Sequence, residues 1–351
     1  MLSQLSYIPT DAIGRGAADR WQSVPEAIPS PADRTAPASP PRPPYAPRMP
    51  LGLDYGLIAA LCWGSSDVLG AIGGRRLGSL PVVAIAQAAS LLVVVVLAIA
   101  QGSGLPSDPG VLAASLVFGV VAAGAYMSFF TALRIGPLSV VSPVVAAYGG
   151  LTVVAAVLIR GETLTFLQAL GAALATAGVV LTGVVFEGGW RGTRFAGRGV
   201  VFSLIAMLLF TVLTVGLATP IRAAGWLPVV LGSRLANAVT VWAVLGIILV
   251  VRSPRASVLL SGSSTEQRGT ASTPARAASA ASFAGLLDVV GTVAFAIGLA
   301  VAPTWIVGLA SSFGPAVAVI VAVALWGERL RPSQWLGLAG IAAGLVAVAL
   351  P

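Results

Sequence analysis

The sequence contains no histidine and no lysine, because all 20 of its basic residues are arginines. These two absences exclude phosphate-binding loops that require a lysine, lysine Schiff bases, and catalysis or metal binding by histidine. The single cysteine, Cys62, cannot form an intrachain disulfide or a thiolate metal cluster. We therefore expect no metal, no cofactor and no nucleotide hydrolysis.

Charge is also scarce in this chain. Charged residues make up 9% of the sequence and hydrophobic residues 57%, whereas an ordinary globular protein carries about 25% charged residues. The net charge of +8 is spread over loops and the N-terminal segment, which indicates membrane topology and contact with lipid head groups rather than nucleic-acid binding. The composition predicts a multi-pass protein of the cell membrane, with the lipid bilayer as its solvent.

Apolar runs divide the chain after residue 52. A bilayer core of about 30 Å needs about 20 apolar residues per helix. The runs cover about residues 55–73, 80–101, 110–133, 138–159, 164–186, 197–219, 226–251, 283–301, 304–326 and 333–350. Runs such as Ser90–Ala100 lack the alternating polarity of a barrel strand, and unpaired amides in hydrocarbon then leave only helices. We predict an all-α integral membrane protein with ten transmembrane helices.

Two polar segments flank or interrupt these runs. Residues 1–52 form a segment rich in proline and arginine, and 11 of the 24 prolines fall in its first 50 residues, so we predict a disordered tail. Met49 directly precedes the first run, which leaves two hypotheses: a solvated tail, or translation that starts at Met49. Residues 252–282, rich in serine, threonine and alanine, predict a flexible polar loop.

The chain contains an internal duplication. Gly161–Gly171 (GETLTFLQALG) and Gly327–Gly337 (GERLRPSQWLG) match at six of eleven positions, 166 residues apart. A second block at Gly78 recurs at Gly225, 147 residues later. Each copy holds five runs, and an odd number makes the second copy enter the membrane from the opposite side. The predicted inverted five-helix repeats span residues 53–187 and 197–350.

The duplicated motif carries a family resemblance. The shared residues that carry it are Gly161, Glu162, Leu164, Gln168 and Gly171 in the first copy and Gly327, Glu328, Leu330, Gln334 and Gly337 in the second, five of the six matching positions. With the Trp63-Gly64 pair and Pro315 ahead of the second motif, it resembles the signature of EamA-type carriers in the drug/metabolite transporter (DMT) superfamily. The sequence departs from that pattern at Gly149, the counterpart of Pro315, and in lacking a second Trp-Gly pair. The resemblance implies ten helices around a central cavity, alternating access for a small-molecule substrate, and no ATP hydrolysis.

Three charged residues, Asp67, Arg234 and Asp288, fall inside predicted helices. Such residues cost about 2.5–3.5 kcal/mol each on insertion scales, so they normally face the bundle interior and have a partner. Two hypotheses stay open. Either Asp67 and Arg234 serve the substrate, with Arg234 attracting an anionic group, or one acid and the arginine form a structural ion pair. Asp288 is expected nearer a membrane edge, which favours a structural role for it.

The polar neighbours of these charges complete the candidate site. The predicted substrate-binding residues are Trp63, Ser66, Asp67, Gln87, Tyr126, Tyr148, Arg234, Asn237 and Ser312. A carboxyl group in a low dielectric holds its proton more tightly, so Asp67 is also the candidate for proton coupling. Gly149 and Pro315 predict helix breaks at matching positions, and interrupted helices near the midplane mark binding sites in transporters.

The leading function is a secondary transporter that moves a small metabolite, namely an amino acid, an organic anion or a drug-like amphiphile. A non-transporting scaffold or lipid-binding protein is the alternative, and a polytopic enzyme fits less well because the intramembrane acids are isolated in sequence. A homodimer is left open. So is the orientation: the arginines of the loops place both termini outside, whereas the resemblance and the arginines of the tail place them inside.

Overall fold

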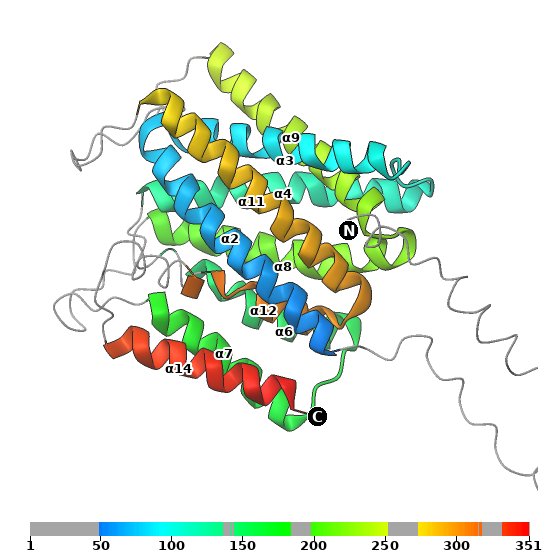
Figure 1. Ribbon diagram of the computed structural model, residues 1–351, viewed down its shortest axis with the longest axis vertical. Coiled ribbons are helices and arrows are strands. Elements are labelled where there is room, and N and C mark those ends of the chain that lie inside the picture. Colours follow the sequence, from blue (N-terminus) through cyan, green and yellow to red (C-terminus); the bar gives the residue numbers. More distant parts are fainter. Residues whose placement is uncertain are drawn as a thin grey trace, which may run out of the picture. The chain divides into compact units, whose positions relative to one another are not determined.

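The computed structural model describes residues 49–135, 141, 144–183, 198–251, 273–314, 316–317 and 332–350, which lie in one compact unit, Pro47–Pro351. The helices of these residues are α2 (Met49–Leu77), α3 (Ser79–Ala100), α4 (Pro109–Ile135), α6 (Tyr148–Arg160), α7 (Phe166–Gly183), α8 (Arg198–Ala224), α9 (Trp226–Val251), α11 (Pro274–Val301), α12 (Thr304–Ser311) and α14 (Pro332–Ala349) (Figure 1). No strand occurs in this part of the chain. The predicted all-α class is confirmed for it.

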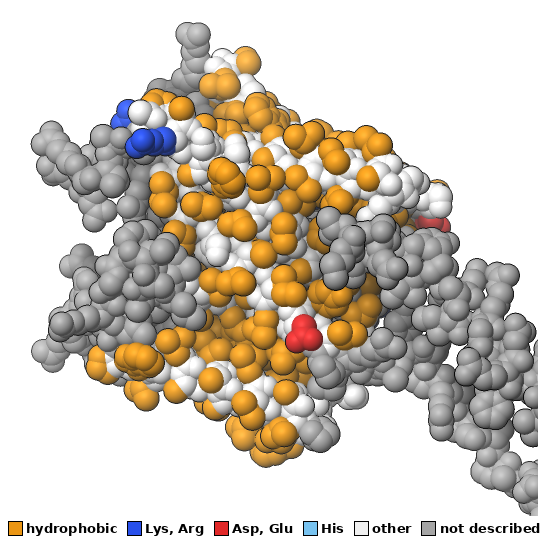
Figure 2. Space-filling view, viewed as in Figure 1, with side chains coloured by type: hydrophobic (Ala, Val, Ile, Leu, Met, Phe, Trp, Pro, Cys, Tyr) orange, Lys and Arg blue, Asp and Glu red, His pale blue; other side chains and the backbone are white. Residues whose placement is uncertain are grey.

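Within the described residues, six helices are long and apolar enough to cross a membrane: α2, α3, α4, α8, α9 and α11. Their outward side chains are strongly apolar, and Leu92, Ile99 and Val250 are 65%, 75% and 82% exposed. Figure 2 shows hydrophobic side chains across this face, with few charged ones among them. Because contiguous exposed apolar surface is rare on water-soluble monomers, these helices indicate a multi-pass membrane protein.

The first helix begins earlier than the sequence suggested. We expected the N-terminal tail to extend to residue 52 and the first span to start near residue 55, but α2 already begins at Met49. The proline at position 50 does not prevent this, because the first turn of a helix has no intrahelical partner for a backbone N–H. Residues 1–48 of the predicted tail lie outside the described residues.

The predicted loop over residues 252–282 is also too long. Helix α11 begins at Pro274, and the Thr273 hydroxyl accepts a hydrogen bond from the backbone N–H of Arg276 at 3.3 Å. We predicted a loop here because residues 274–282 include polar side chains. Alanine, the strongest helix former, is nevertheless the most frequent residue in this segment. Residues 252–272 lie outside the described part. The early start places Asp288 near the middle of α11, not near its end.

The packing of the two halves follows one rule. In chain order, α2, α3, α4, α6 and α7 correspond to α8, α9, α11, α12 and α14. Helix α2 packs against α11 as α8 packs against α4, α3 packs against α11 as α9 packs against α4, and α2 packs against α12 as α8 packs against α6. The pairs α3–α9, α6–α12 and α7–α14 join helices to their own counterparts (Figure 1). The contacts of one half recur in the other with the roles exchanged.

The pair α7–α14 is held together by glycines. A Cβ atom added at Gly171 would lie 2.8 Å from the carbonyl oxygen of Gly344, and one added at Gly178 would lie 2.7 Å from that of Gly337. The start of α7 therefore meets the end of α14, so the two helices run antiparallel. The offset of 166 residues relates Gly171 to Gly337 and Gly178 to Gly344, which makes the two contacts equivalent. Small residues allow this close approach where no hydrophobic force drives helix association.

The turns after the first helix of each half also match. Gly78 connects α2 to α3 with a φ angle of 92°, and Gly225 connects α8 to α9 with a φ angle of 84°. A side chain at this φ is strained, whereas glycine adopts it readily. The repeated sequence block at these two positions therefore encodes the same turn twice.

Glu162 joins the two halves at the start of α12. Its carboxylate accepts hydrogen bonds from the backbone N–H groups of Thr304 and Trp305, both at 3.0 Å, and so caps a helix in the other half. Arg160 pairs with Glu162 at 3.3 Å, and Arg222 lies 3.8 Å from the same oxygen. This cluster connects the end of α6 to the start of α12. Its counterpart Glu328 lies outside the described residues.

We predict that Gly178→Ala destabilises the protein by about 1–3 kcal/mol, because the added methyl group overlaps the backbone of α14 and overpacking carries this cost. Thermal unfolding of the purified protein in detergent measures the effect. The control is Gly246→Ala in α9, where an added Cβ atom meets nothing within 4 Å. Equal unfolding temperatures for the two variants would contradict the close glycine crossing.

Candidate functional site

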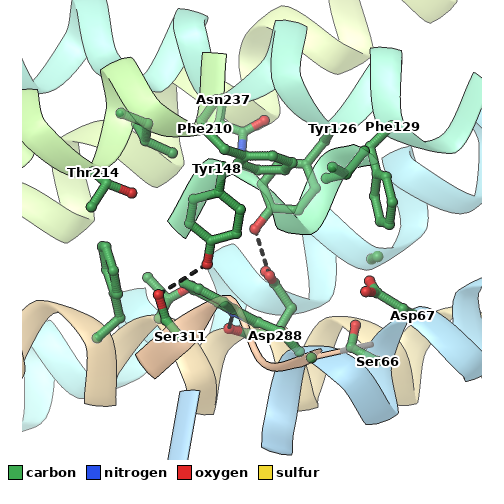
Figure 3. Close-up of a pocket in the computed structure, with 18 of the residues that line it drawn as sticks. Ser66, Asp67, Tyr126, Phe129, Tyr148, Phe210, Thr214, Asn237, Asp288 and Ser311 are labelled. Atoms are coloured by element: carbon green, nitrogen blue, oxygen red, sulfur yellow. Dashed lines mark hydrogen bonds between the residues drawn. The ribbon is translucent and has the colours of Figure 1, made fainter. Parts of the chain in front are cut away.

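A cavity of about 130 Å³ lies between the helices of the two halves. A single buried water needs about 10–15 Å³ on the same measure, so this space exceeds that of one water or one bare ion. Its walls come from α2, α3, α4, α6, α8, α9 and α11 and from the turn after α12 (Figure 3). The lining is mainly apolar and aromatic, with a small number of polar and charged groups.

The structure brings the predicted substrate-binding residues together. Trp63, Ser66, Asp67, Gln87, Tyr126, Tyr148, Arg234, Asn237 and Ser312 all line this one cavity. Gly149 is not part of the lining and lies where α6 crosses α12. Pro315 lies outside the described residues. The nine residues come from elements far apart in the chain, so their gathering is a property of the fold.

Arg234 and Asp288 form a buried ion pair at the centre of the polar groups. The Arg234 Nη1 atom lies 2.6 Å from Asp288 Oδ2, and the two residues are 5% and 4% exposed. Nη1 also donates to Gln87 Oε1 at 2.7 Å, and Nη2 donates to the hydroxyl of Thr292. The other carboxylate oxygen of Asp288 accepts a hydrogen bond from the Tyr126 hydroxyl at 2.6 Å (Figure 3).

This network corrects the expected position of Asp288. We placed Asp288 near a membrane edge, but it is central in α11, lines the cavity and neutralises Arg234. The error followed from the start of α11, which the sequence analysis set at residue 283. Asp288 is also the acid of the structural ion pair that we left unassigned, since Asp67 makes no such contact.

The ion pair links four helices, because Gln87 belongs to α3, Tyr126 to α4, Arg234 to α9 and Asp288 to α11. Removing one partner of a buried pair leaves the other charge uncompensated, which costs about 3–5 kcal/mol. Asn237 extends the network by donating to Gln87 Oε1 at 3.0 Å, while its own Oδ1 atom stays buried without a partner. The network therefore fixes the helices that form the cavity.

Asp67 stands apart from this network. It lies on α2 and lines the cavity, and it makes no hydrogen bond or ion pair with the residues that the structure describes. Its neighbour Ser66 donates instead to the carbonyl oxygen of Ala284 at 2.8 Å. In Figure 3 the Asp67 carboxylate points into the space beside the pair formed by Tyr126 and Asp288. Among the described residues, none offsets the charge of Asp67.

Aromatic rings form a continuous wall of the cavity. Tyr126 and Phe210 pack at 5.6 Å between ring centroids, Phe129 and Phe130 at 5.5 Å, and Tyr148 and Phe210 at 5.9 Å. The sequence analysis did not select Phe129, Phe130 or Phe210 as site residues. The duplication could have indicated Phe129, because Phe129 and Phe295 are equivalent residues, 166 positions apart, and both line the cavity.

Two interrupted helices meet at the cavity. A turn at Ala147 precedes α6, and a turn at Ser312 and Phe313 follows α12. Ala147 and Phe313 are 166 residues apart, so the interruptions are at equivalent positions. The Tyr148 and Ser311 hydroxyls hydrogen-bond across the two helices at 2.9 Å. At Gly149 an added Cβ atom would lie 2.5 Å from the Cβ atom of Ser312, so glycine is needed for this approach.

Comparison with known proteins supports the resemblance that the sequence suggested. Residues 50–184 match the model of the EamA-like transporter family, a family of membrane transporters, not of enzymes. A solved structure titled "Crystal structure of protein" has a TM-score of 0.67 to this chain at 18% identity, and the match covers 85% of this chain and 96% of the other. No curated protein sequence was found to match. The structural likeness, which concerns the fold alone, extends well beyond the family match into the second half.

We predict that Arg234→Gln lowers the free energy of unfolding by about 3–5 kcal/mol, because it leaves Asp288 charged, buried and unpaired. The double variant Arg234→Gln/Asp288→Asn removes both charges and keeps an acceptor for Tyr126, so it should regain most of that stability. Thermal unfolding of the purified single and double variants provides the measurement. If Arg234→Gln is as stable as the wild type, the pair is not structural.

Proposed function

We propose, from the match of residues 50–184 to the EamA-like transporter family, that this protein is a secondary transporter that moves a small metabolite by alternating access. The observation that carries the proposal is the cavity itself. It lies among helices from both halves, contains the charged residues of α2, α9 and α11, and adjoins the two interrupted helices. Charged groups inside a membrane bundle normally mark a substrate or ion route.

An inverted duplication supports alternating access. The exchanged helix contacts and the matching turns at Gly78 and Gly225 fit a pseudo-twofold relation between residues 53–187 and 197–350. Helices α7 and α14 run antiparallel, as equivalent helices do when the axis lies in the membrane plane; an axis along the membrane normal would make them parallel. With such symmetry, exchanging the conformations of the two halves opens the cavity to the other side of the membrane.

We assign substrate binding to the nine predicted residues that line the cavity. Trp63, Tyr126 and Tyr148 contribute aromatic surface, while Gln87 and Asn237 contribute amide groups. Arg234 supports the site through its pair with Asp288. The polar groups orient a ligand, and the apolar lining provides most of the contact area, which is the usual division in ligand sites.

Asp67 is the proposed proton-coupling residue. It lines the cavity, and no described residue forms a hydrogen bond or an ion pair with it. A carboxyl group that exchanges its proton between the two faces of the membrane would couple transport to the proton gradient.

We predict opposite sidedness for equivalent loop positions. Arg76 and Ala223 are 147 residues apart, and both are exposed beside the turn glycines. In a Cys62→Ala background, Arg76→Cys should react with a membrane-impermeant maleimide from one side of the membrane, and Ala223→Cys only from the other. Labelling of both from the same side, in intact and in permeabilised cells, contradicts the inverted repeat.

We predict that Asp67→Asn uncouples transport from the proton gradient but still allows downhill exchange once the substrate concentration is high enough to occupy the cavity. Comparative metabolite profiling of cells with and without the protein first identifies the substrate. Sealed vesicles with an imposed pH gradient then compare the two proteins, and the wild type should accumulate substrate while Asp67→Asn only equilibrates it. Unchanged accumulation by the variant removes Asp67 from the coupling step. Metabolite pools that do not depend on the protein would favour the scaffold alternative.

A further inference from the structure

The charges of the cavity do not balance. Among the described residues that line it, the charged ones are Asp67, Arg234 and Asp288, which together carry one positive and two negative charges when all are ionised. Arg234 and Asp288 neutralise each other at 2.6 Å. The charge that remains free to act on a ligand is therefore the negative charge of Asp67.

We infer that the cavity selects an organic cation, a protonated amine or a quaternary ammonium group on an apolar body, and holds its charge at Asp67. This inference rests on the proposed function and names the substrate class of the same cavity. Of the three substrate classes that the sequence left open, it favours drug-like amphiphiles that carry a cationic nitrogen over organic anions.

Arg234 is poorly placed to bind an anion. Its guanidinium is engaged by Asp288, Gln87 and Thr292, and its central carbon lies 5.9 Å from the centre of the Tyr126 ring. An anion that approached it would have to displace the Asp288 carboxylate, which would then remain buried without its counter-charge. The same anion would be repelled by both Asp288 and Asp67, and such repulsion is strong where water is excluded.

Asp67 has the opposite properties. An ionised carboxylate only accepts hydrogen bonds, and no described residue donates one to it. The buried Oδ1 atom of Asn237 in the same lining also lacks a donor. A ligand with a cationic nitrogen supplies the positive charge that Asp67 lacks, and an N–H group on that nitrogen provides a donor for such acceptors. Binding then removes an unfavourable desolvated charge instead of creating one.

The aromatic wall fits the rest of such a ligand. Trp63 lies one turn before Asp67 on α2, and Phe129 and Tyr148 border the same space (Figure 3). Faces of aromatic rings attract cations within about 6 Å of their centres. No group of three or more acidic, cysteine or histidine side chains that could hold a metal occurs among the described residues. The lining therefore suits an organic cation better than a metal ion.

Three probes of one skeleton separate charge from shape: phenethylammonium is positive, phenylacetate negative and phenylacetamide neutral. Their binding to the purified full-length protein is measured by calorimetry in nanodiscs of uncharged lipid, which avoids attraction of cations by anionic head groups. We expect phenethylammonium to bind about tenfold or more tightly than the other two, because one unbalanced charge acts in a low dielectric.

Variants on one helix assign that preference. Asp67→Asn keeps the shape of the side chain and should lower phenethylammonium affinity to that of phenylacetamide, whereas Asp67→Glu should retain the preference. Asp54→Asn is the matched control, because Asp54 lies on the same helix α2 but is exposed and does not line the cavity. If Asp67→Asn reduces the amount of folded protein, the three probes on the wild type decide alone.

Four results would overturn the inference: tighter binding of phenylacetate, equal binding of the three probes, no binding of any, or a cation preference that persists in folded Asp67→Asn. Flux measurements keep this outcome separate from that of the proposed function. Vesicles that transport an anion would leave the carrier standing and remove the cation site. Cation binding at Asp67 without flux of any identified metabolite would support the cation site and contradict the proposed transport function.

Discussion

The buried ion pair between Arg234 and Asp288 is the interaction on which the central part of the structure depends. Neither charge tolerates the apolar interior alone, so α9 and α11 must hold the two groups in contact, and hydrogen bonds from Gln87 and Tyr126 tie α3 and α4 to the same point. The apolar outer faces of these helices provide little directional preference for one helix packing over another. The polar centre supplies that preference, and the cavity forms around it.

The close contacts of the remaining helices come from glycine and from exchanged partners. Glycines bring α7 to α14 and α6 to α12, while Glu162 of the first half caps the start of α12 in the second. Because each contact type recurs between equivalent helices, the central groups lie where the two halves meet. A cavity at such a junction is bordered by both halves, so a relative movement of the halves changes its access without rebuilding its lining.

The cavity combines a satisfied charge pair with an unsatisfied acid, and this difference gives the site its chemistry. Asp288 has its positive partner and a hydroxyl donor, whereas Asp67 has neither among the residues that the structure describes. An acid of the first kind holds helices together, and an acid of the second kind is available to a proton or to a ligand. The aromatic rings beside Asp67 add a surface that attracts positive charge. Under our proposal, Asp288 stabilises the helix packing and Asp67 selects the ligand.

The sequence by itself determined the all-α class, the apolar spans and the internal duplication, because hydropathy and spacing are local properties that survive without coordinates. It also identified nine of the residues that line the cavity, because polar groups such as Asp67, Gln87 and Asn237 are conspicuous inside apolar runs. It placed the start of α11 too late, because the helix-forming tendency of the alanines after Pro274 outweighed the polar composition of that segment. The position of Asp288 within the helix was therefore wrong as well. Only the tertiary structure decided which acid pairs with Arg234, because that choice depends on how α2, α9 and α11 pack, and helix packing is set by contacts between residues far apart in the chain.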